Sequence, residues 1–195
     1  MKILIACEES QTVTKAFRAL GHEAYSCNVE PCSGGHPEWH LQQDVLPLLK
    51  EKWDMIIAFP PCTYLSNAGA RFLYPKGILN PDRLKLGLQG TDFFMKFYDA
   101  NCEKIVIENP LPSSIYSLPK HQQVIQPYQF GHPLKKRTQL WLKGVPALLP
   151  TYIVEPMQST KVPGNWFNKG GKDRQKNRSK TFQGIADAMA MQWSD

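Results

Sequence analysis

One cysteine of the chain follows a rigid pair of prolines. Cys62 comes directly after Pro60-Pro61, and because proline fixes its own φ and restricts the residue before it, the thiol is held in a stiff turn. The ordinary alternative for a free thiol is a buried apolar cysteine. Glu108 follows the next apolar run of the sequence. A thiolate that adds to C6 of a pyrimidine makes C5 nucleophilic, and a carboxyl group at the N3 edge assists the addition. Cys62 and Glu108 are therefore candidates for covalent catalysis on a pyrimidine.

Short apolar runs alternate with helical patterns along the chain. Strands are predicted at residues 2–7, 22–29, 53–59, 104–107 and 138–142. Helices are predicted at residues 12–20, 46–52, 81–100 and 181–193. The long third helix is expected to turn inward the side chains of Leu84, Leu88, Phe93, Phe94 and Phe97. This alternation predicts a doubly wound, mostly parallel α/β sheet in a single domain, with ligands at the carboxyl ends of the strands.

Two carboxylates follow other predicted strands. Glu30 ends the second strand, where a carboxylate binds ribose because it accepts two hydrogen bonds from a diol. Asp44 lies one strand end further on and can accept a hydrogen bond from an adenine amine. For either residue the alternative is a solvated loop acid. Together they indicate a site for an adenosine-containing cofactor.

Two short motifs resemble those of a known family. Residues 59–62 (Phe-Pro-Pro-Cys) and 107–110 (Ile-Glu-Asn-Pro) look like the Pro-Cys and Glu-Asn motifs of cytosine-C5 DNA methyltransferases. Residues 136–142 resemble the arginine motif of that family, and residues 184–190 resemble its closing helix. Over nearly its full length the chain is similar to the short bacteriophage-type proteins of this family, as in the Phe-Gly-His-Pro sequence at residues 130–133.

The resemblance implies a Rossmann-like fold of the methyltransferase type. It also implies methyl transfer from S-adenosylmethionine to C5 of cytosine in DNA that is flipped from its stack or single-stranded. In that reaction Cys62 attacks C6, Glu108 steadies the protonated N3 and Arg137 orients the ring. The residues implied for cofactor binding are Cys7, Glu8, Glu30, Asp44, Phe59, Pro60 and Asp187.

Two departures from the family pattern leave alternatives open. The first motif of the family is a Phe-x-Gly-x-Gly loop, whereas residues 7–12 contain no glycine. The family also carries a large target-recognition region, for which only residues 144–180 are available here. The alternatives are modification of a free pyrimidine nucleotide and a non-catalytic relative that binds nucleotides or nucleic acid.

Basic charge is concentrated in two segments. The formal net charge is +6, and the excess lies around residues 135–137 and 161–180. The second segment interleaves aromatic residues, glycines and cations, as nucleic-acid-binding loops do, although a solvated loop is the alternative. The predicted contacts with a nucleic-acid backbone are Lys135, Lys136, Lys161, Lys169, Lys172, Arg174 and Arg178. His132, after a glycine, is expected to be a turn histidine rather than a ligand contact.

Metal binding, disulfides and export are not expected. The series Cys27, Cys32, His36 and His40 has the residue types of a zinc site, but its spacing and its start inside a predicted strand indicate accidental proximity. Five cysteines and the lack of a signal sequence predict reduced thiols in a cytoplasmic protein. No apolar run reaches the length of a membrane span.

Overall fold

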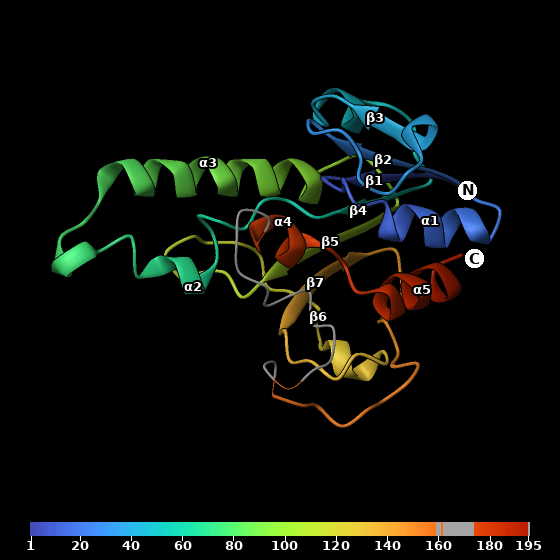
Figure 1. The fold of residues 1–195 in the computed structure, drawn as a ribbon. Helices are drawn as coiled ribbons and strands as arrows, with labels where there is room; N and C mark the ends of the chain where they lie inside the picture. Colours follow the sequence, from blue (N-terminus) through green and yellow to red (C-terminus); the bar gives the residue numbers. More distant parts are fainter. Residues whose placement is uncertain (159–160, 162–173, 195) are drawn as a thin grey trace.

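A seven-stranded sheet forms the centre of the computed structural model, which describes residues 1–158, 161 and 174–194 (Figure 1). The strands are β1 (Lys2–Ala6), β2 (Glu23–Asn28), β3 (His40–Gln42), β4 (Met55–Ala58), β5 (Lys104–Pro110), β6 (Gln123–Ile125) and β7 (Thr138–Lys143). Their order in the sheet is β3-β2-β1-β4-β5-β7-β6. The strands from β3 to β5 are mutually parallel, and β7 is antiparallel to both neighbours. The predicted mostly parallel α/β sheet is confirmed.

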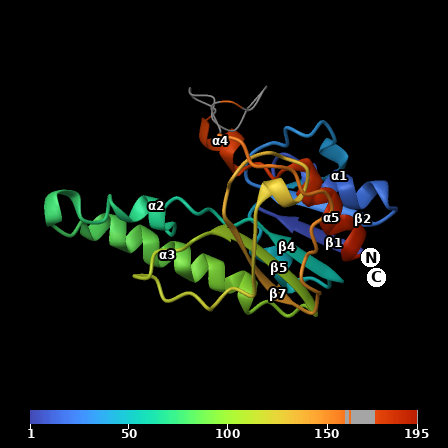
Figure 2. The same cartoon turned by 90° about the horizontal axis from the view of Figure 1, so that it is seen from below.

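The helices cover both faces of this sheet. They are α1 (Thr12–Ala19), α2 (Asn67–Ala70), α3 (Pro81–Tyr98), α4 (Arg174–Ser179) and α5 (Gln183–Gln192), with 3-10 turns η1 (Pro37–Trp39), η2 (Pro47–Lys50), η3 (Pro75–Gly77) and η4 (Pro127–Gln129). Helices α1 and α5 pack together on one face, and α3 lies on the other (Figures 1 and 2). The connections reverse direction between β1 and β4, so the carboxyl ends of these two strands flank a topological switch point.

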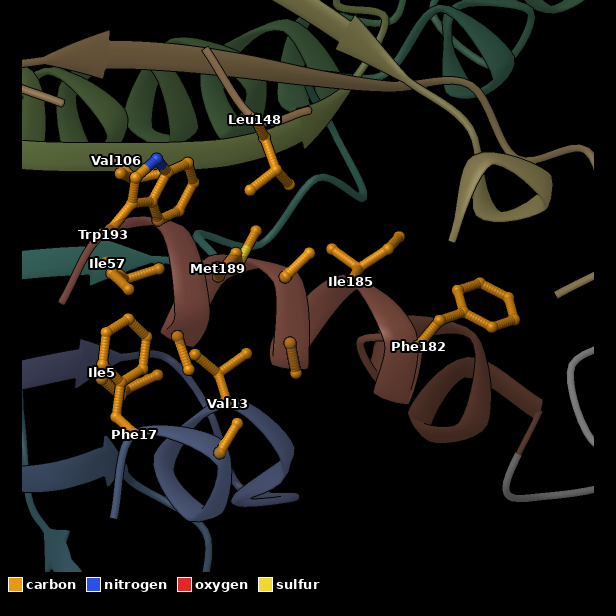
Figure 3. Close-up of a cluster of buried hydrophobic side chains, with 14 of the residues drawn as sticks. Ile5, Val13, Phe17, Ile57, Val106, Leu148, Phe182, Ile185, Met189 and Trp193 are labelled. Atoms are coloured by element: carbon orange, nitrogen blue, oxygen red, sulfur yellow. The ribbon is translucent and has the colours of Figure 1, made fainter. Parts of the chain in front are cut away.

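The two faces of each central strand contribute to separate hydrophobic clusters. Ile5, Phe17 and Trp193 all belong to the hydrophobic cluster on the face of α1 and α5, part of which Figure 3 shows. Leu4, the next residue toward the amino end, packs with Phe97 of α3 on the other face. Because side chains alternate along a strand and both faces are covered, the central strands are apolar without interruption. That continuity made them recognisable in the sequence.

A tight contact joins α5 to the loop after η4. A Cβ atom on Gly184 would collide with the carbonyl oxygen of Phe130, so only glycine fits at this position. The N–H of Gly184 donates to Nε2 of His132 at 3.0 Å. His132 thus satisfies a free donor in the first turn of the helix. This structural contact agrees with the turn role expected of it.

Several predicted boundaries were wrong. The segment predicted as a helix at 46–52 is the short 3-10 turn η2, and β3 and β6 were not predicted. Strand β5 continues to Pro110 because it pairs with β7, so Glu108 lies inside the strand. Leu88, expected to point inward, is 50% exposed because the amino-terminal half of α3 extends beyond the sheet (Figure 1). Within the described residues, no helix combines the length and apolar character needed to cross a membrane.

Candidate functional site

The loop that carries Cys62 is fixed from both sides at the switch point. The N–H of Phe59 donates to the carbonyl of Ala6 at 3.0 Å, which continues the pairing of β4 with β1. The side-chain amide of buried Asn109 donates to the carbonyl of Pro60 at 3.1 Å. After the prolines, the carbonyl of Cys62 accepts the N–H of Ser66 at 2.9 Å and so closes a turn. These bonds hold the Pro-Pro-Cys segment against the end of β5.

Cys62 is partly buried and lies within the electrostatic reach of three charged side chains. Burial is the main cause that raises the pKa of its thiol, and the carboxylate of Glu108 raises it further. Lys136 and Arg178 act in the opposite direction and favour the thiolate. We call these four residues the thiol cluster. In the free protein at neutral pH the sulfur therefore carries its proton.

Glu108 is the acid of the thiol cluster. Burial raises the pKa of its carboxyl group, while Lys136 and a hydrogen bond with Thr138 oppose the rise. A raised pKa makes this carboxyl group better able to hold and donate a proton than an exposed glutamate. The thiol cluster therefore combines a thiol with a carboxyl group suited to proton donation.

The cation that completes the thiol cluster is not the one expected. Nζ of Lys136 donates to the carbonyl oxygen of Arg178 at 3.1 Å, and its charge acts on both Cys62 and Glu108. Arg137, the next residue along the chain, was predicted to orient the ring. Its side chain is exposed. Sequence reasoning assigned Lys136 only to the nucleic-acid backbone. Its proximity to Cys62 depends on how β7 and α4 pack.

The loop after β1 makes glycine-like turns without glycine. Cys7 and Gln11 have φ angles of 61° and 57°, in the left-handed region that favours glycine. Burial, with smaller effects from Cys27 and Asp44, raises the pKa of the Cys7 thiol to about 12. Cys7 therefore remains a protonated thiol at neutral pH.

Glu8, predicted to bind the cofactor, caps α1. Its carboxylate accepts the N–H of Val13 at 2.7 Å, the N–H of Thr14 at 3.2 Å and the hydroxyl of Thr14 at 2.7 Å. These donors belong to the first turn of the helix, whose N–H groups have no partner inside the helix. Both oxygens of Glu8 are thus already used by the fold.

Glu9 is the acid in this loop that sequence reasoning missed. It is only 8% exposed, and among the described residues neither of its carboxylate oxygens has a hydrogen-bond partner. The ammonium of Lys176 on α4 lies 3.5 Å from Oε2. This ion pair places a cation beside the buried carboxylate, while the hydrogen-bonding capacity of its two oxygens stays unused in the described part of the chain. In the sequence, Glu8 and Glu9 are adjacent acids after the same predicted strand. The sequence alone therefore did not distinguish their roles.

The remaining residues predicted to bind the cofactor are dispersed around the β1 to β4 strand ends and on α5. Glu30 and Asp44 are exposed, and the carboxylate of Asp44 accepts the N–H of Leu46 at 3.0 Å. Asp187 is exposed on α5 and accepts the amide of Gln183 at 2.7 Å. The two apolar members, Phe59 and Pro60, are partly and fully buried respectively.

The predicted nucleic-acid contacts are only partly visible. Lys135 and Lys161 are exposed, Lys169 and Lys172 lie outside the described residues, and the side chain of Arg174 does too. The side chain of Lys176 on α4 reaches Glu9, and the backbone of Arg178 binds Lys136. Helix α4 thus contacts both the β1 loop and the thiol cluster.

Comparisons with known proteins give a distant relative in structure. No protein-family model matches the chain, and no curated protein matches it. Among solved structures 33 chains match. One is a candidate DNA modification methyltransferase encoded within a prophage (E. coli), with 12% sequence identity and a TM-score of 0.47. The match covers 87% of this chain and 55% of that one, so the chain spans about half the length of that protein.

Proposed function

We propose that the protein transfers a methyl group from S-adenosylmethionine to C5 of cytosine in DNA, with Cys62 as the nucleophile. The observation that carries this proposal is the thiol cluster beside the switch point, in which a carboxyl group and two cations act on the Cys62 thiol and Lys136 also acts on Glu108. Sites of this kind, with perturbed pKa values and defined charge partners at a strand-end crevice, are typical of catalysis. The sequence resemblance to cytosine-C5 methyltransferases assigns the same two residues to this chemistry.

Cys62 supplies the first step. Its thiol loses a proton to solvent and adds to C6 of the base, which places electron density on C5. Once C5 carries the methyl group, its hydrogen is lost to water as a proton and the thiolate is eliminated from C6. Lys136 and Arg178 favour the thiolate and thus lower the cost of this ionisation. The rigid turn and the hydrogen bond from Asn109 to Pro60 hold the sulfur in place, which reduces the entropy that the addition must overcome.

Glu108 supplies the complementary proton. Because burial raises the pKa of this carboxyl group, it can donate to N3 of the cytosine as the thiolate adds. Protonation at N3 neutralises the negative charge that the thiolate brings to the ring, while C5 becomes nucleophilic. Lys136 keeps the resulting carboxylate from being an isolated buried charge.

The β1 loop is suited to a cationic methyl donor. S-adenosylmethionine carries an ammonium and a sulfonium, and the buried carboxylate of Glu9, which is paired with Lys176 at 3.5 Å, has oxygens without hydrogen-bond partners in the described part of the chain. Glu30 has an exposed carboxylate at the end of β2, where ribose hydroxyls are bound in folds of this kind. When bound, the cofactor supplies the electrophilic methyl group.

The test uses tritiated S-adenosylmethionine with duplex DNA, single-stranded DNA and free deoxycytidine monophosphate. We expect label in DNA, and a loss of at least about 10³-fold in Cys62→Ser, because serine is a far weaker nucleophile without a base. Cys32→Ser is the matched control, since Cys32 is also partly buried but belongs to the loop after β2. Equal incorporation by Cys62→Ser and the wild type would exclude the assigned nucleophile. Label only in the free nucleotide would replace DNA by a mononucleotide substrate.

A further inference from the structure

A long projection separates Cys62 from the sheet-covering part of α3. We define the arm as residues 63–88, which include α2, η3 and the amino-terminal turns of α3. Figures 1 and 2 both show these elements extending away from the sheet, with the turn that carries η3 at the far end. The thiol cluster uses none of the arm residues.

The arm is held together by hydrogen bonds between its own residues. The N–H of Asn80 donates to the carbonyl of buried Leu73 at 2.8 Å, and the side chain of Asn80 caps α3 by accepting the N–H of Arg83 at 3.1 Å. At its base, Gly87 leaves room for Tyr116, whose ring and hydroxyl a Cβ would meet. The arm therefore presents its outer side chains in a defined arrangement.

Stacked aromatic rings and guanidinium groups line the arm. The guanidinium of Arg83 lies 5.0 Å from the ring centroid of Tyr64 and 5.2 Å from that of Phe72. It also donates to the carbonyl oxygens of Thr63 and Gly69, each at 3.2 Å. The guanidinium of Arg71 lies over Phe72 at 4.7 Å. Since Thr63 directly follows Cys62, this series of stacked groups begins next to the candidate nucleophile.

The arm also leaves aromatic surface exposed. Phe72 and Tyr74 are 51% and 48% exposed. Beside them is a hollow of about 440 Å³, lined by Tyr64, Phe72, Pro75, Asn80, Asp82, Arg83 and Leu86. Exposed apolar surface grouped in this way marks a site of interaction.

The charge of the arm favours a polyanion as the partner. Its cations are Arg71, Lys76, Arg83 and Lys85, against the single carboxylate of Asp82. A second copy of the chain would bring the same positive charge to the contact, which disfavours self-association through the arm. Single-stranded nucleic acid presents both phosphates for the cations and unpaired base faces for the aromatic rings. In a duplex those base faces are already stacked.

We infer that the arm binds single-stranded DNA beside Cys62, with bases stacked on Phe72 and Tyr74 and phosphates near the cations. This inference rests on the proposed function only in taking DNA as the substrate. The arm provides a surface that holds the strand, in a chain with little room for a large recognition region. Binding of this kind makes an unpaired cytosine the favoured target.

The experiment measures binding without the methyl donor. Fluorescence anisotropy of a labelled oligodeoxycytidine, free and annealed to its complement, is followed in the Cys62→Ser protein with and without Phe72→Leu/Tyr74→Leu. We expect the single strand to bind more tightly than the duplex. The leucine pair should weaken single-strand binding by about tenfold to a hundredfold, because stacking contributes about 1–3 kcal/mol per base. The pair Phe72→Tyr/Tyr74→Phe keeps the rings and should retain the affinity, as should Tyr152→Ala, which removes an exposed ring outside the arm.

Three outcomes would overturn the inference. They are unchanged single-strand affinity in the leucine pair, a preference for duplex, and a dimer in sedimentation that the leucine pair converts to monomers while DNA binding stays intact. The last outcome would make the arm a self-association surface. If the wild type binds single strands through the arm but incorporates no label from S-adenosylmethionine, only the proposed methyl transfer fails.

Discussion

The two groups of strand ends at this edge of the sheet use their charged side chains differently. At the ends of β1 to β3, which we call the donor half because the proposed methyl donor would bind there, both oxygens of Glu8 cap α1, and Cys7 is held as a neutral thiol with a pKa of about 12. In the thiol half, after β4 and β5, Glu108 raises the pKa of Cys62, and Lys136 lowers the pKa of both residues. Residues at equivalent strand ends thus serve the fold on one side and, in the proposed function, reactive chemistry on the other.

This contrast teaches that position after a strand does not by itself assign a function. Glu8 and Glu9 are adjacent acids at the same strand end, yet one has three hydrogen bonds and the other has none within the described chain. The difference lies in where α1 begins. What a carboxylate contacts decides whether it is available to a ligand.

The largest effect is expected from Glu108→Gln, which removes the proton donor of the thiol half. Methyl transfer should fall by about 10²- to 10⁴-fold, the usual contribution of a general acid. At a pH high enough to ionise Glu108 in the wild type, alkylation of Cys62 by iodoacetamide should become faster in the variant, because the charged carboxylate raises the pKa of the thiol. The two opposite changes are measured on the same preparation. A parallel loss of both would show that the substitution had damaged the site as a whole.

The next effect compares Lys136→Gln with Arg137→Gln. Loss of the Lys136 ammonium should raise the pKa of both Cys62 and Glu108, so alkylation of Cys62 should shift to higher pH. Methyl transfer should fall about tenfold to a hundredfold, as for loss of one charged interaction. Arg137→Gln should leave the pH profile of alkylation unchanged, whatever it does to DNA binding. If Arg137→Gln moves that profile and Lys136→Gln does not, the cation of the thiol cluster has been misassigned.

The sequence was informative where a physical constraint acts along the chain. The central strands were predicted because burial of both faces requires uninterrupted apolar residues, whereas β3 and β6 are three residues long and contain polar residues. Cys62 and Glu108 were predicted as site residues from their motifs, and the structure places both in the thiol cluster. The role of Lys136 could not be predicted, because it depends on residues 62, 108 and 178 meeting in space. The arm was not predicted, because its aromatic residues are spread through a loop in which the sequence shows no recognised motif.

A smaller effect concerns the stability of the donor half. Glu8→Ala should lower the free energy of unfolding by about 1–3 kcal/mol, because the first turn of α1 loses its acceptors in a buried setting. Glu30→Ala, at an exposed position, should change it by no more than about 0.5 kcal/mol. Urea unfolding of both variants gives the comparison. Equal and small changes would mean that Glu8 is not structural and is available to a ligand after all.

The smallest expected effect is a pH dependence in the stability of the helix pair α1 and α5, which supports the donor half. Helix α5 packs on α1, and its first turn is bound by Nε2 of His132, which accepts the N–H of Gly184 only when that nitrogen carries no proton. Burial lowers the pKa of His132, and Asp187 opposes the change. A lowered pKa means that the folded state prefers the neutral ring. The stabilisation is therefore present above the unfolded pKa of about 6.5 and is lost as the pH falls through the lower folded value.

His132→Gln isolates this contribution, because a glutamine oxygen can accept the same N–H but does not titrate. Between about pH 7 and pH 5 the wild type should lose about 1 kcal/mol more stability in urea than the variant, the value of one hydrogen bond. His22, whose pKa burial also lowers, is present in both proteins, so its contribution cancels. Hydrogen exchange at pH 5 should then show earlier opening of α1 and α5 than of β4 and β5 in the wild type alone. Identical pH dependence in the two proteins would mean that acid does not act on the donor half through His132.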